Sequence, residues 1–376
     1  MTIPDIRSVQ DIQGKRVLVR SSLNVLIKDG KVADDFRLKQ MLPTITFLRE
    51  KRARIILMGH LGRVQNETLK PVHEYFKALF PLTFSEELVG SSVRLKAESL
   101  KEGEVLLLEN LRKDEREENN ESAFSKALAS LGELYVNESF DASHREHASI
   151  VGVPRYLQSY AGIEFLNEIK SLQSAQQPKH PSLFILGGAK FETKQPLVEK
   201  FLDIYDHTFV GGALANDFFK AKGYQIGRSL VSDTSLNLLH LLQDKRLMLP
   251  SDVVVENEKG IRRTTEPTDV HIGESILDMG PKTGAELLKR AQGAEFILWN
   301  GPFGNYERGF SEQTESFAKA LATLSATSII GGGDTVASIG KLNLLNKFGF
   351  VSIGGGAMLD YLLSGTLPGI EALQNN

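Results

Sequence analysis

The sequence of 376 residues contains no cysteine. This absence excludes a disulfide framework and a thiolate zinc site. The segment from Met1 to Arg16 lacks the apolar stretch of a secretory signal peptide. No apolar run approaches the roughly 18 to 20 residues that a membrane-spanning helix needs. We therefore expect a cytoplasmic protein without a membrane partner.

A surplus of positive charge is also missing. The chain has 44 lysines and arginines against 47 aspartates and glutamates, for a formal net charge of -3. Proteins that bind nucleic acid generally carry an excess of Lys and Arg on at least one face. The balance predicts no nucleic-acid partner, and any basic ligand site must be a local cluster.

Two frequent phosphotransferase signatures are absent as well. The chain has no G-x-x-x-x-G-K-[ST] phosphate loop and no protein-kinase G-x-G-x-x-G followed by H-R-D. A nucleotide-binding function therefore requires a different design.

What the chain does contain is a series of short apolar runs with amphipathic segments between them, the pattern of a parallel sheet built from βαβ units. The length favours two domains. The predicted class is α/β, with two doubly wound, Rossmann-like parallel-sheet domains. Strands are expected near residues 17–19, 55–58, 105–108, 134–136, 183–186, 208–210, 253–255, 296–299, 328–330 and 350–352.

One amphipathic segment lies between the two halves. Residues 160–175 place Phe165, Ile169 and Leu172 at helical spacing, and the polar stretch QQPKHP follows them. This pattern predicts a helix that connects the domains. The expected boundaries are 1–158 for the first domain, 159–176 for the helix and 177–359 for the second domain.

Cationic and polar residues follow the strands of the first half. Because ligands of open parallel sheets bind beyond the carboxyl ends of the strands, these residues are candidates for one site. Guanidinium groups present paired donors to carboxylate and phosphate, so the cluster would suit a small anionic metabolite. For any single arginine, a solvated surface position is an equally good interpretation. The residues are Arg20, Asn24, His60, Arg63, Asn110, Arg112, His144, Arg145 and His147.

The strands of the second half are followed by glycines instead. Glycine-rich turns before a helix let backbone N–H groups approach phosphate oxygens. A single glycine pair more often marks a tight turn, but four such turns on one sheet edge favour a nucleotide site. Asp334 is either a Mg²⁺ ligand or an ordinary helix N-cap. The turns are Gly187-Gly188, Gly211-Gly212, Gly331 to Gly333 and Gly354 to Gly356.

Taken together, the motifs resemble those of the phosphoglycerate kinase family. The strings VLVRSSLN, HLGR, LLLENLR, SHREHAS, ILGGAKFETK, WNGPFGNYE, GGGDT and SIGGGAML occur in this order over nearly the whole chain. The resemblance implies a phosphoglycerate-binding first domain, to which a C-terminal tail of residues 360–376 returns, and a Mg-nucleotide-binding second domain. It also implies reversible phosphoryl transfer between 1,3-bisphosphoglycerate with ADP and 3-phosphoglycerate with ATP, in glycolysis and gluconeogenesis, by a monomer.

The resemblance also implies roles for individual residues. Catalytic roles near the transferred phosphoryl group fall to Arg37, Lys190, Gly333 and Gly356. The acceptor would be bound by Ser22, Asn24, Arg37, His60, Arg63, Arg112 and Arg145. The nucleotide would be bound by Gly187, Gly188, Lys194, Gly211, Gly212, Asn300, Glu307, Gly332, Gly333, Asp334 and Thr335, with Asp334 holding Mg²⁺. Transfer would be direct and in line, with closure of the two domains.

Two departures from the family pattern bear on the acceptor site. Where the family usually reads R-V-D-x-N-V-P, this sequence has Ser22 in place of the aspartate, which ordinarily accepts a hydrogen bond from the substrate hydroxyl. Where the family usually reads N-D-A-F-G-T-A-H-R, Asp141 stands in place of the glycine. A lost charge-assisted hydrogen bond costs on the order of 1.5 to 3 kcal/mol. In a pocket of the usual kind, Ser22→Asp should lower the KM for 3-phosphoglycerate.

These departures leave two alternatives open. One is a catalytically silent relative that keeps nucleotide binding, and the other is a related kinase for a different carboxylate. Ser22 and the added carboxylate of Asp141 motivate the first alternative. The second is considered because both departures fall in the substrate domain and none clearly in the nucleotide domain.

Overall fold

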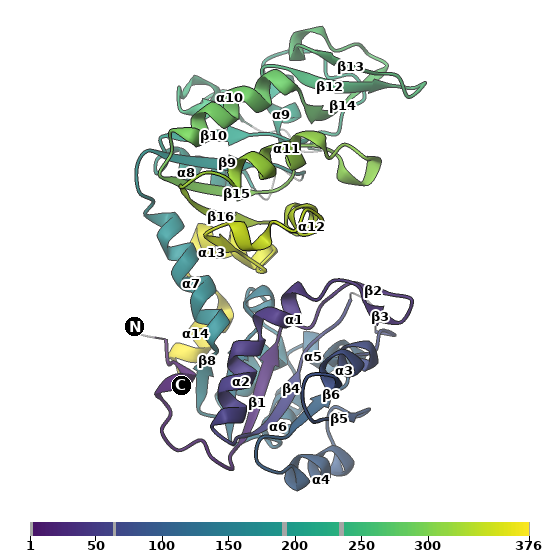
Figure 1. Cartoon of the computed structure of the whole chain (residues 1–376), viewed down its shortest axis with the longest axis vertical. Helices are drawn as coiled ribbons and strands as arrows, with labels where there is room; N and C mark the ends of the chain where they lie inside the picture. Colours follow the sequence, from purple (N-terminus) through teal and green to yellow (C-terminus); the bar gives the residue numbers. More distant parts are fainter. Residues whose placement is uncertain (1–2, 63–64, 190–193, 233–236, 376) are drawn as a thin grey trace. The chain divides into compact units, whose positions relative to one another are not determined.

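The computed structural model describes residues 3–62, 65–189, 194–232 and 237–375. Arg63 and Lys190 therefore lie outside the described residues. The chain forms two compact units, one of Met1–Lys170 with Ser364–Asn376 and one of Ser171–Leu363. Helix α7 (Ile163–Gln176) contains the boundary between them, and each unit has its own sheet (Figure 1).

The first unit is built on a six-stranded parallel sheet in the order β5-β6-β4-β1-β7-β8. The strands are β1 (Arg16–Ser21), β4 (Arg54–Met58), β5 (Leu82–Ser85), β6 (Val105–Leu108), β7 (Leu134–Glu138) and β8 (Ser159–Ala161). Val17, Leu18 and Val19 of β1 are fully buried, so both faces of the central strand are covered. This explains why β1 is a continuous apolar run rather than an alternating one.

The helices of the first unit and the hairpin β2 (Ile27–Lys28) with β3 (Lys31–Val32) surround this sheet. The C-terminal helix packs here as well, through buried Ile370 and Leu373, so the expected return of the chain end to the first unit is confirmed. The helices are α1 (Phe36–Gln40), α2 (Leu42–Glu50), α3 (Lys70–Lys77), α4 (Ser91–Ser99), α5 (Glu115–Glu118), α6 (Ser122–Ala129) and α14 (Pro368–Gln374).

The second unit has a six-stranded parallel sheet in the order β11-β10-β9-β15-β16-β17. Its strands are β9 (Ser182–Leu186), β10 (His207–Val210), β11 (Leu247–Met248), β15 (Phe296–Asn300), β16 (Thr327–Gly331) and β17 (Phe350–Val351). Its helices are α8 (Gln195–Leu202), α9 (Leu214–Ala221), α10 (Pro281–Gln292), α11 (Glu312–Leu321), α12 (Gly333–Lys341) and α13 (Gly356–Ser364). The predicted class of two parallel-sheet α/β domains is confirmed.

A second, antiparallel sheet of the same unit was not expected. It consists of β13 (Arg262–Thr265), β12 (Val253–Asn257) and β14 (Glu274–Met279). The expected parallel strand at residues 253–255 belongs to it, because Val253 and Val255 are buried while Val254 between them is only partly buried. Such one-sided burial is typical of an antiparallel sheet with one face in contact with a core.

The connecting helix begins later than expected. Residues 159–161 form β8, whose backbone pairs with β7, and α7 starts only at Ile163. Phe165, Ile169 and Leu172, on which the prediction depended, are buried on this helix. Within the described part of the chain, no helix combines the length and the apolar character that a membrane span requires.

In both parallel sheets the order in which the chain adds strands reverses near the centre. In the first sheet, β4 lies on one side of β1 and β7 on the other. In the second sheet, β10 and β11 lie on one side of β9, and β15, β16 and β17 lie on the other. Crevices at such positions, beyond the carboxyl ends of the strands, are where doubly wound proteins bind ligands. The two candidate half-sites lie at these places.

Candidate active site

Arg20, at the end of β1, organises the first half-site from within the core. Its side chain is fully buried and donates hydrogen bonds to Ser149 Oγ at 2.9 Å and to the Ser21 carbonyl at 2.7 Å. Ser149 Oγ in turn donates to the buried carboxylate of Glu117 at 2.5 Å. Arg20 is therefore a structural cation beneath the site rather than an exposed ligand group.

His60, in the loop after β4, is oriented by this buried arginine. Nη2 of Arg20 lies 2.9 Å from His60 Nδ1, which must act as the acceptor because a guanidinium can only donate. Burial and the neighbouring cations Arg20, Arg112 and Arg145 hold the pKa of His60 well below its usual value. The neutral ring therefore carries its proton on Nε2, where it can donate to a ligand oxygen.

Asn110 connects the HLGR and ENLR loops. Its amide donates to the carbonyls of Leu61 and Glu67, each at 2.9 Å, and its oxygen accepts from the N–H of Leu61 at 3.1 Å. The same oxygen caps the short helix at Leu111–Lys113. Asn110 thereby fixes two ligand loops to each other and is itself fully buried.

The other described members of the first half-site surround these loops. Asn24 Oδ1 accepts from the N–H of Gly62 at 2.9 Å. Arg112 is 8% exposed, donates to the Gly62 carbonyl and lies 3.3 Å from Glu118. Arg145 Nε donates to His144 Nε2 at 3.3 Å. The structure thus brings residues far apart in the sequence to one sheet edge.

Asp141 lies inside this cluster, in direct contact with Ser22 and Arg37. Its Oδ1 accepts from Ser22 Oγ at 2.5 Å and from Ser139 Oγ at 2.6 Å, and its Oδ2 pairs with Arg37 Nη1 at 3.0 Å. Burial opposes ionisation of this carboxyl, but the charge of Arg37 and the hydrogen bonds from the two hydroxyl donors outweigh it, so its pKa lies well below the usual value. Asp141 is therefore an ionised, paired carboxylate.

The second half-site begins at the glycine turns after β9 and β10. Gly188 and Gly212 have positive φ angles of 87° and 63°, which favour glycine. A Cβ on Gly212 would lie 2.6 Å from the Gly188 nitrogen, and one on Gly187 would collide with the Pro302 carbonyl. These glycines allow the turns after β9, β10 and β15 to approach one another.

Lys194 lies against this turn. Its Nζ donates to the Gly187 carbonyl at 2.9 Å. Burial lowers the pKa of Lys194 to about 8, although the nearby carboxylate of Asp334 opposes the shift. The ammonium is therefore predominantly protonated at neutral pH, close to the glycine turn.

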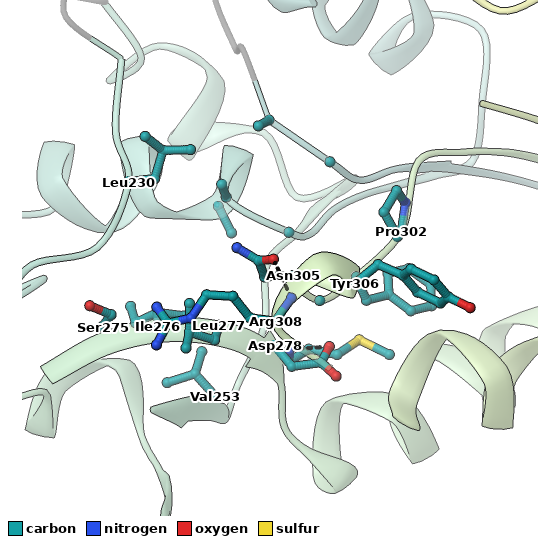
Figure 2. A pocket seen from close by; sticks show the side chains of 18 of the residues that line it. Leu230, Val253, Ser275, Ile276, Leu277, Asp278, Pro302, Asn305, Tyr306 and Arg308 are labelled. Atoms are coloured by element: carbon teal, nitrogen blue, oxygen red, sulfur yellow. Dashed lines mark hydrogen bonds between the residues drawn. The ribbon is translucent and has the colours of Figure 1, made fainter. Parts of the chain in front are cut away.

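A pocket of about 430 Å³ opens beside the glycines (Figure 2). Gly188, Gly212, Glu307 and Asp334 line it, together with an apolar wall that includes Leu230, Val253, Ile276 and Leu277. Leu230 is 63% exposed, which leaves an apolar surface available to a flat ring. Pockets with apolar walls and a few polar groups at one end are typical small-molecule sites.

A second hollow of about 370 Å³ continues from the same turn. Its lining includes Gly332, Gly333 and Asp334 at the start of α12 and Gly355 and Gly356 at the start of α13. It also includes Asn300 at the end of β15 and Lys194 at the start of α8. Free N–H groups at two helix starts and one lysine make this hollow suitable for phosphate groups. Gly211 lies against the Phe209 ring, and Thr335 is fully buried and lines neither hollow.

The residues present fit a nucleotide-bound Mg²⁺. Asp334 is exposed in the first turn of α12 and lines both hollows. Among the described residues no cluster of three or more His, Cys, Asp or Glu could hold a metal alone. One carboxylate suffices for Mg²⁺, which usually completes its coordination with water and substrate phosphates.

Several residues of the half-sites were not predicted from the sequence. The apolar pocket wall comes from β12, β14 and the segment around Leu230, which lack a recognisable motif. Asp278 lies near the end of β14 and lines the same pocket, and burial raises its pKa to about 7. The contact between Ser22 and Asp141 joins positions 119 residues apart, so it could not be inferred from local spacing.

Fold and half-sites together define a two-unit α/β enzyme of the phosphotransferase class. The family model described as Phosphoglycerate kinase matches residues 6–365. The chain therefore belongs to the phosphoglycerate kinase family. It is a kinase with a carboxyl group as phosphoryl acceptor, as expected. Neither a silent relative nor a kinase for a different carboxylate is favoured.

Individual relatives agree with this assignment. Phosphoglycerate kinase of Roseiflexus sp. (strain RS-1) is 39% identical over 394 aligned positions, which span 100% of this chain and 99% of the relative. A phosphoglycerate kinase of Thermus thermophilus is 41% identical over 97% of this chain and 98% of the relative. The solved structures of the Coxiella burnetii and Pyrococcus horikoshii phosphoglycerate kinases match with TM-scores of 0.83 and 0.86, at 34% and 30% identity, over at least 98% of each chain.

Proposed function

We propose that the first unit binds 3-phosphoglycerate or 1,3-bisphosphoglycerate and that the second unit binds ADP or ATP with Mg²⁺. The observation that carries the proposal is the difference between the two sheet edges, one with cationic side chains and one with glycine turns and helix starts. Anionic groups of the acceptor would be held by Asn24, Arg37, His60, Arg63, Arg112 and Arg145.

On the nucleotide side, the apolar pocket would take the adenine ring between the glycines and the wall around Leu230. Glu307, at the pocket rim, would accept hydrogen bonds from the ribose hydroxyls. Lys194, Asn300 and the turn at Gly332 and Gly333 would hold the phosphates. Thr335 is fully buried, so its predicted phosphate contact would require the start of α12 to rearrange.

Transfer would be direct and in line, without a phosphoenzyme. The acceptor carboxylate is already a nucleophile, so no general base is needed, and catalysis depends on positioning and charge neutralisation. Arg37, Lys190 and the N–H groups at Gly333 and Gly356 would stabilise the charge on the moving phosphoryl group. Mg²⁺, held by Asp334, would neutralise charge on the nucleotide phosphates when bound.

Because the two ligands are assigned to different units, transfer requires a closure that brings the units together and excludes water. Small-angle scattering should show a smaller radius of gyration with both ligands than with either one. Unchanged dimensions would contradict the closure. The same measurement reports the molecular mass and tests the expected monomer.

A coupled spectrophotometric assay tests the proposed reaction. With ATP, Mg²⁺ and 3-phosphoglycerate, the wild-type chain should turn over, and omission of any one of the three should abolish turnover. Lys190→Ala is the control for a contaminating kinase, because loss of a cation at the transferred group should lower kcat by roughly 10²- to 10³-fold. Turnover with other carboxylates but not with 3-phosphoglycerate would favour the altered-substrate alternative.

A further inference from the structure

We propose that Asp141 is a specificity-determining residue that accepts a hydrogen bond from the acceptor's hydroxyl group, in place of the carboxylate that residue 22 lacks. The inference rests on the proposed function and adds a residue to the acceptor site. Its starting point is the carboxylate of Asp141 in contact with both Ser22 and Arg37, within a cluster whose expected members are mainly cationic.

The chemistry of the acceptor explains the need for such a group. The phosphate and carboxylate of 3-phosphoglycerate match arginines, whereas its hydroxyl is a donor that requires an acceptor. Arginine side chains have no acceptor atom, and Asn24 Oδ1 already accepts from the Gly62 N–H. A carboxylate inside the cluster provides what the cations cannot.

The carboxylate of Asp141 has the capacity for this bond. Oδ1 takes two hydroxyl donors, Ser22 and Ser139, which fix the orientation of the group. Oδ2 accepts from Arg37, and a carboxylate oxygen can accept a second hydrogen bond. The Asp141 side chain is only 7% exposed, so a hydroxyl reaching Oδ2 would form the bond in a largely desolvated place, where charge-assisted bonds are strong.

The local backbone also accepts a side chain here. Asp141 lies in the short helix Phe140–Ala142. The described non-glycine residues with positive φ are Asp29, Arg52, Asn120 and Asn343, so the conformation of residue 141 does not demand glycine. The exchange of glycine for aspartate therefore introduces a carboxylate without backbone strain.

The contact between Ser22 and Asp141 reverses one expectation from the sequence. Because Ser22 Oγ lies 2.5 Å from Asp141, Ser22→Asp would place two carboxylates side by side. Like charges at that distance repel, and one of the two carboxyls would become protonated or displaced. Ser22→Asp should therefore raise the KM for 3-phosphoglycerate in this chain rather than lower it.

A reciprocal exchange tests the proposal. The set is wild type, Ser22→Asp, Asp141→Gly and the double variant, which have one, two, no and one carboxylate at the site. Each single variant should lower kcat/KM for 3-phosphoglycerate by about 10- to 100-fold, the loss expected for a charge-assisted hydrogen bond. The double variant should recover most of this loss. If Asp141→Gly leaves KM unchanged or lowers it, Asp141 merely blocks Arg37 and the proposal is overturned.

A second readout separates recognition of the hydroxyl from folding. Phosphooxypropanoate differs from 3-phosphoglycerate only in lacking the hydroxyl. The wild type and the double variant should prefer 3-phosphoglycerate, whereas Asp141→Gly should bind the two compounds almost equally in calorimetry. Asp141→Asn, which keeps the volume, should retain a weaker preference. An unchanged preference in Asp141→Gly would overturn the inference, whereas absence of wild-type turnover would count against the proposed function itself.

Discussion

The two proposed half-sites offer anions different kinds of binding group. In the first unit these are side-chain charges such as Arg37, which pairs with Asp141, and Arg112, which donates to the Gly62 carbonyl. The second uses glycine turns, helix starts and one lysine. Side chains can be exchanged between positions, as Ser22 and Asp141 indicate, whereas a backbone site depends on the absence of side chains. The first unit should therefore tolerate relocation of a group, and the second should not.

Removal of Arg37 should give the largest effect. Arg37→Ala removes a cation from the transferred group and should lower kcat by roughly 10²- to 10³-fold. Arg37→Lys should recover only part of this, because an ammonium lacks the planar paired donors. Steady-state kinetics measure kcat of both variants. The affinity for ADP, measured by calorimetry, should remain as in the wild type. A kcat within threefold of wild type would contradict the role given to Arg37.

A single added methyl group tests the glycine-turn half-site of the second unit. Gly212→Ala places a Cβ 2.6 Å from the Gly188 nitrogen at a positive φ, so the second unit should lose roughly 1 to 3 kcal/mol of stability and most of its ADP affinity. Gly273→Ala is the matched control, because a Cβ there meets nothing within 4 Å and the residue lines neither hollow. Fluorescence of Trp299, the single tryptophan, reports unfolding of this unit. Equal behaviour of the two variants would refute the steric argument.

Buried carboxylates provide a third comparison. Asp141 is paired with a cation, whereas burial without a cation raises the pKa of Asp278 to about 7. The folded chain thus keeps a proton that the unfolded carboxyl loses near pH 4, and this group lowers stability as pH rises from about 4 to 7. Asp278→Asn should therefore stabilise the second unit by roughly 1 to 3 kcal/mol at pH 8 and not at pH 4. Denaturant titrations followed at Trp299 would show no pH-dependent difference between the two proteins if the pKa of Asp278 were not raised.

The smallest effect is expected from titration of Lys194. Its pKa of about 8 in the free protein means that the ammonium loses its charge as pH rises above that value. The affinity for ADP should fall several-fold between pH 7 and 9. Lys194→Arg should flatten this dependence because arginine stays protonated. An identical pH profile in the two proteins would exclude Lys194 from phosphate binding.

Much of the fold was predictable because the central parallel strands are continuous apolar runs in the sequence, such as residues 17–19 and 55–58. The edge strand β5 and the antiparallel strands β13 and β14 escaped prediction because they are short, polar or buried on one face only. Their existence depends on pairing with distant partners, which local periodicity does not report.

The candidate site shows the same division. The motif residues Asn24, His60 and Arg112 were identified as candidates from strand ends, and the structure places them at one sheet edge. The orientation of His60 by Arg20 and the contact between Ser22 and Asp141 depend on tertiary proximity. In the sequence, Ser22 and Asp141 are two separate departures from the family pattern. In the structure they belong to one hydrogen-bonded group.

Calorimetric titration of each ligand into Arg37→Ala and Gly212→Ala tests the central claim most directly, namely that each unit binds its own ligand by its own chemistry. We expect a crossed result, in which Arg37→Ala loses affinity for 3-phosphoglycerate and keeps its affinity for ADP, while Gly212→Ala loses affinity for ADP and keeps its affinity for 3-phosphoglycerate. Loss of both ligands in a folded variant, or loss of the ligand assigned to the other unit, would contradict it.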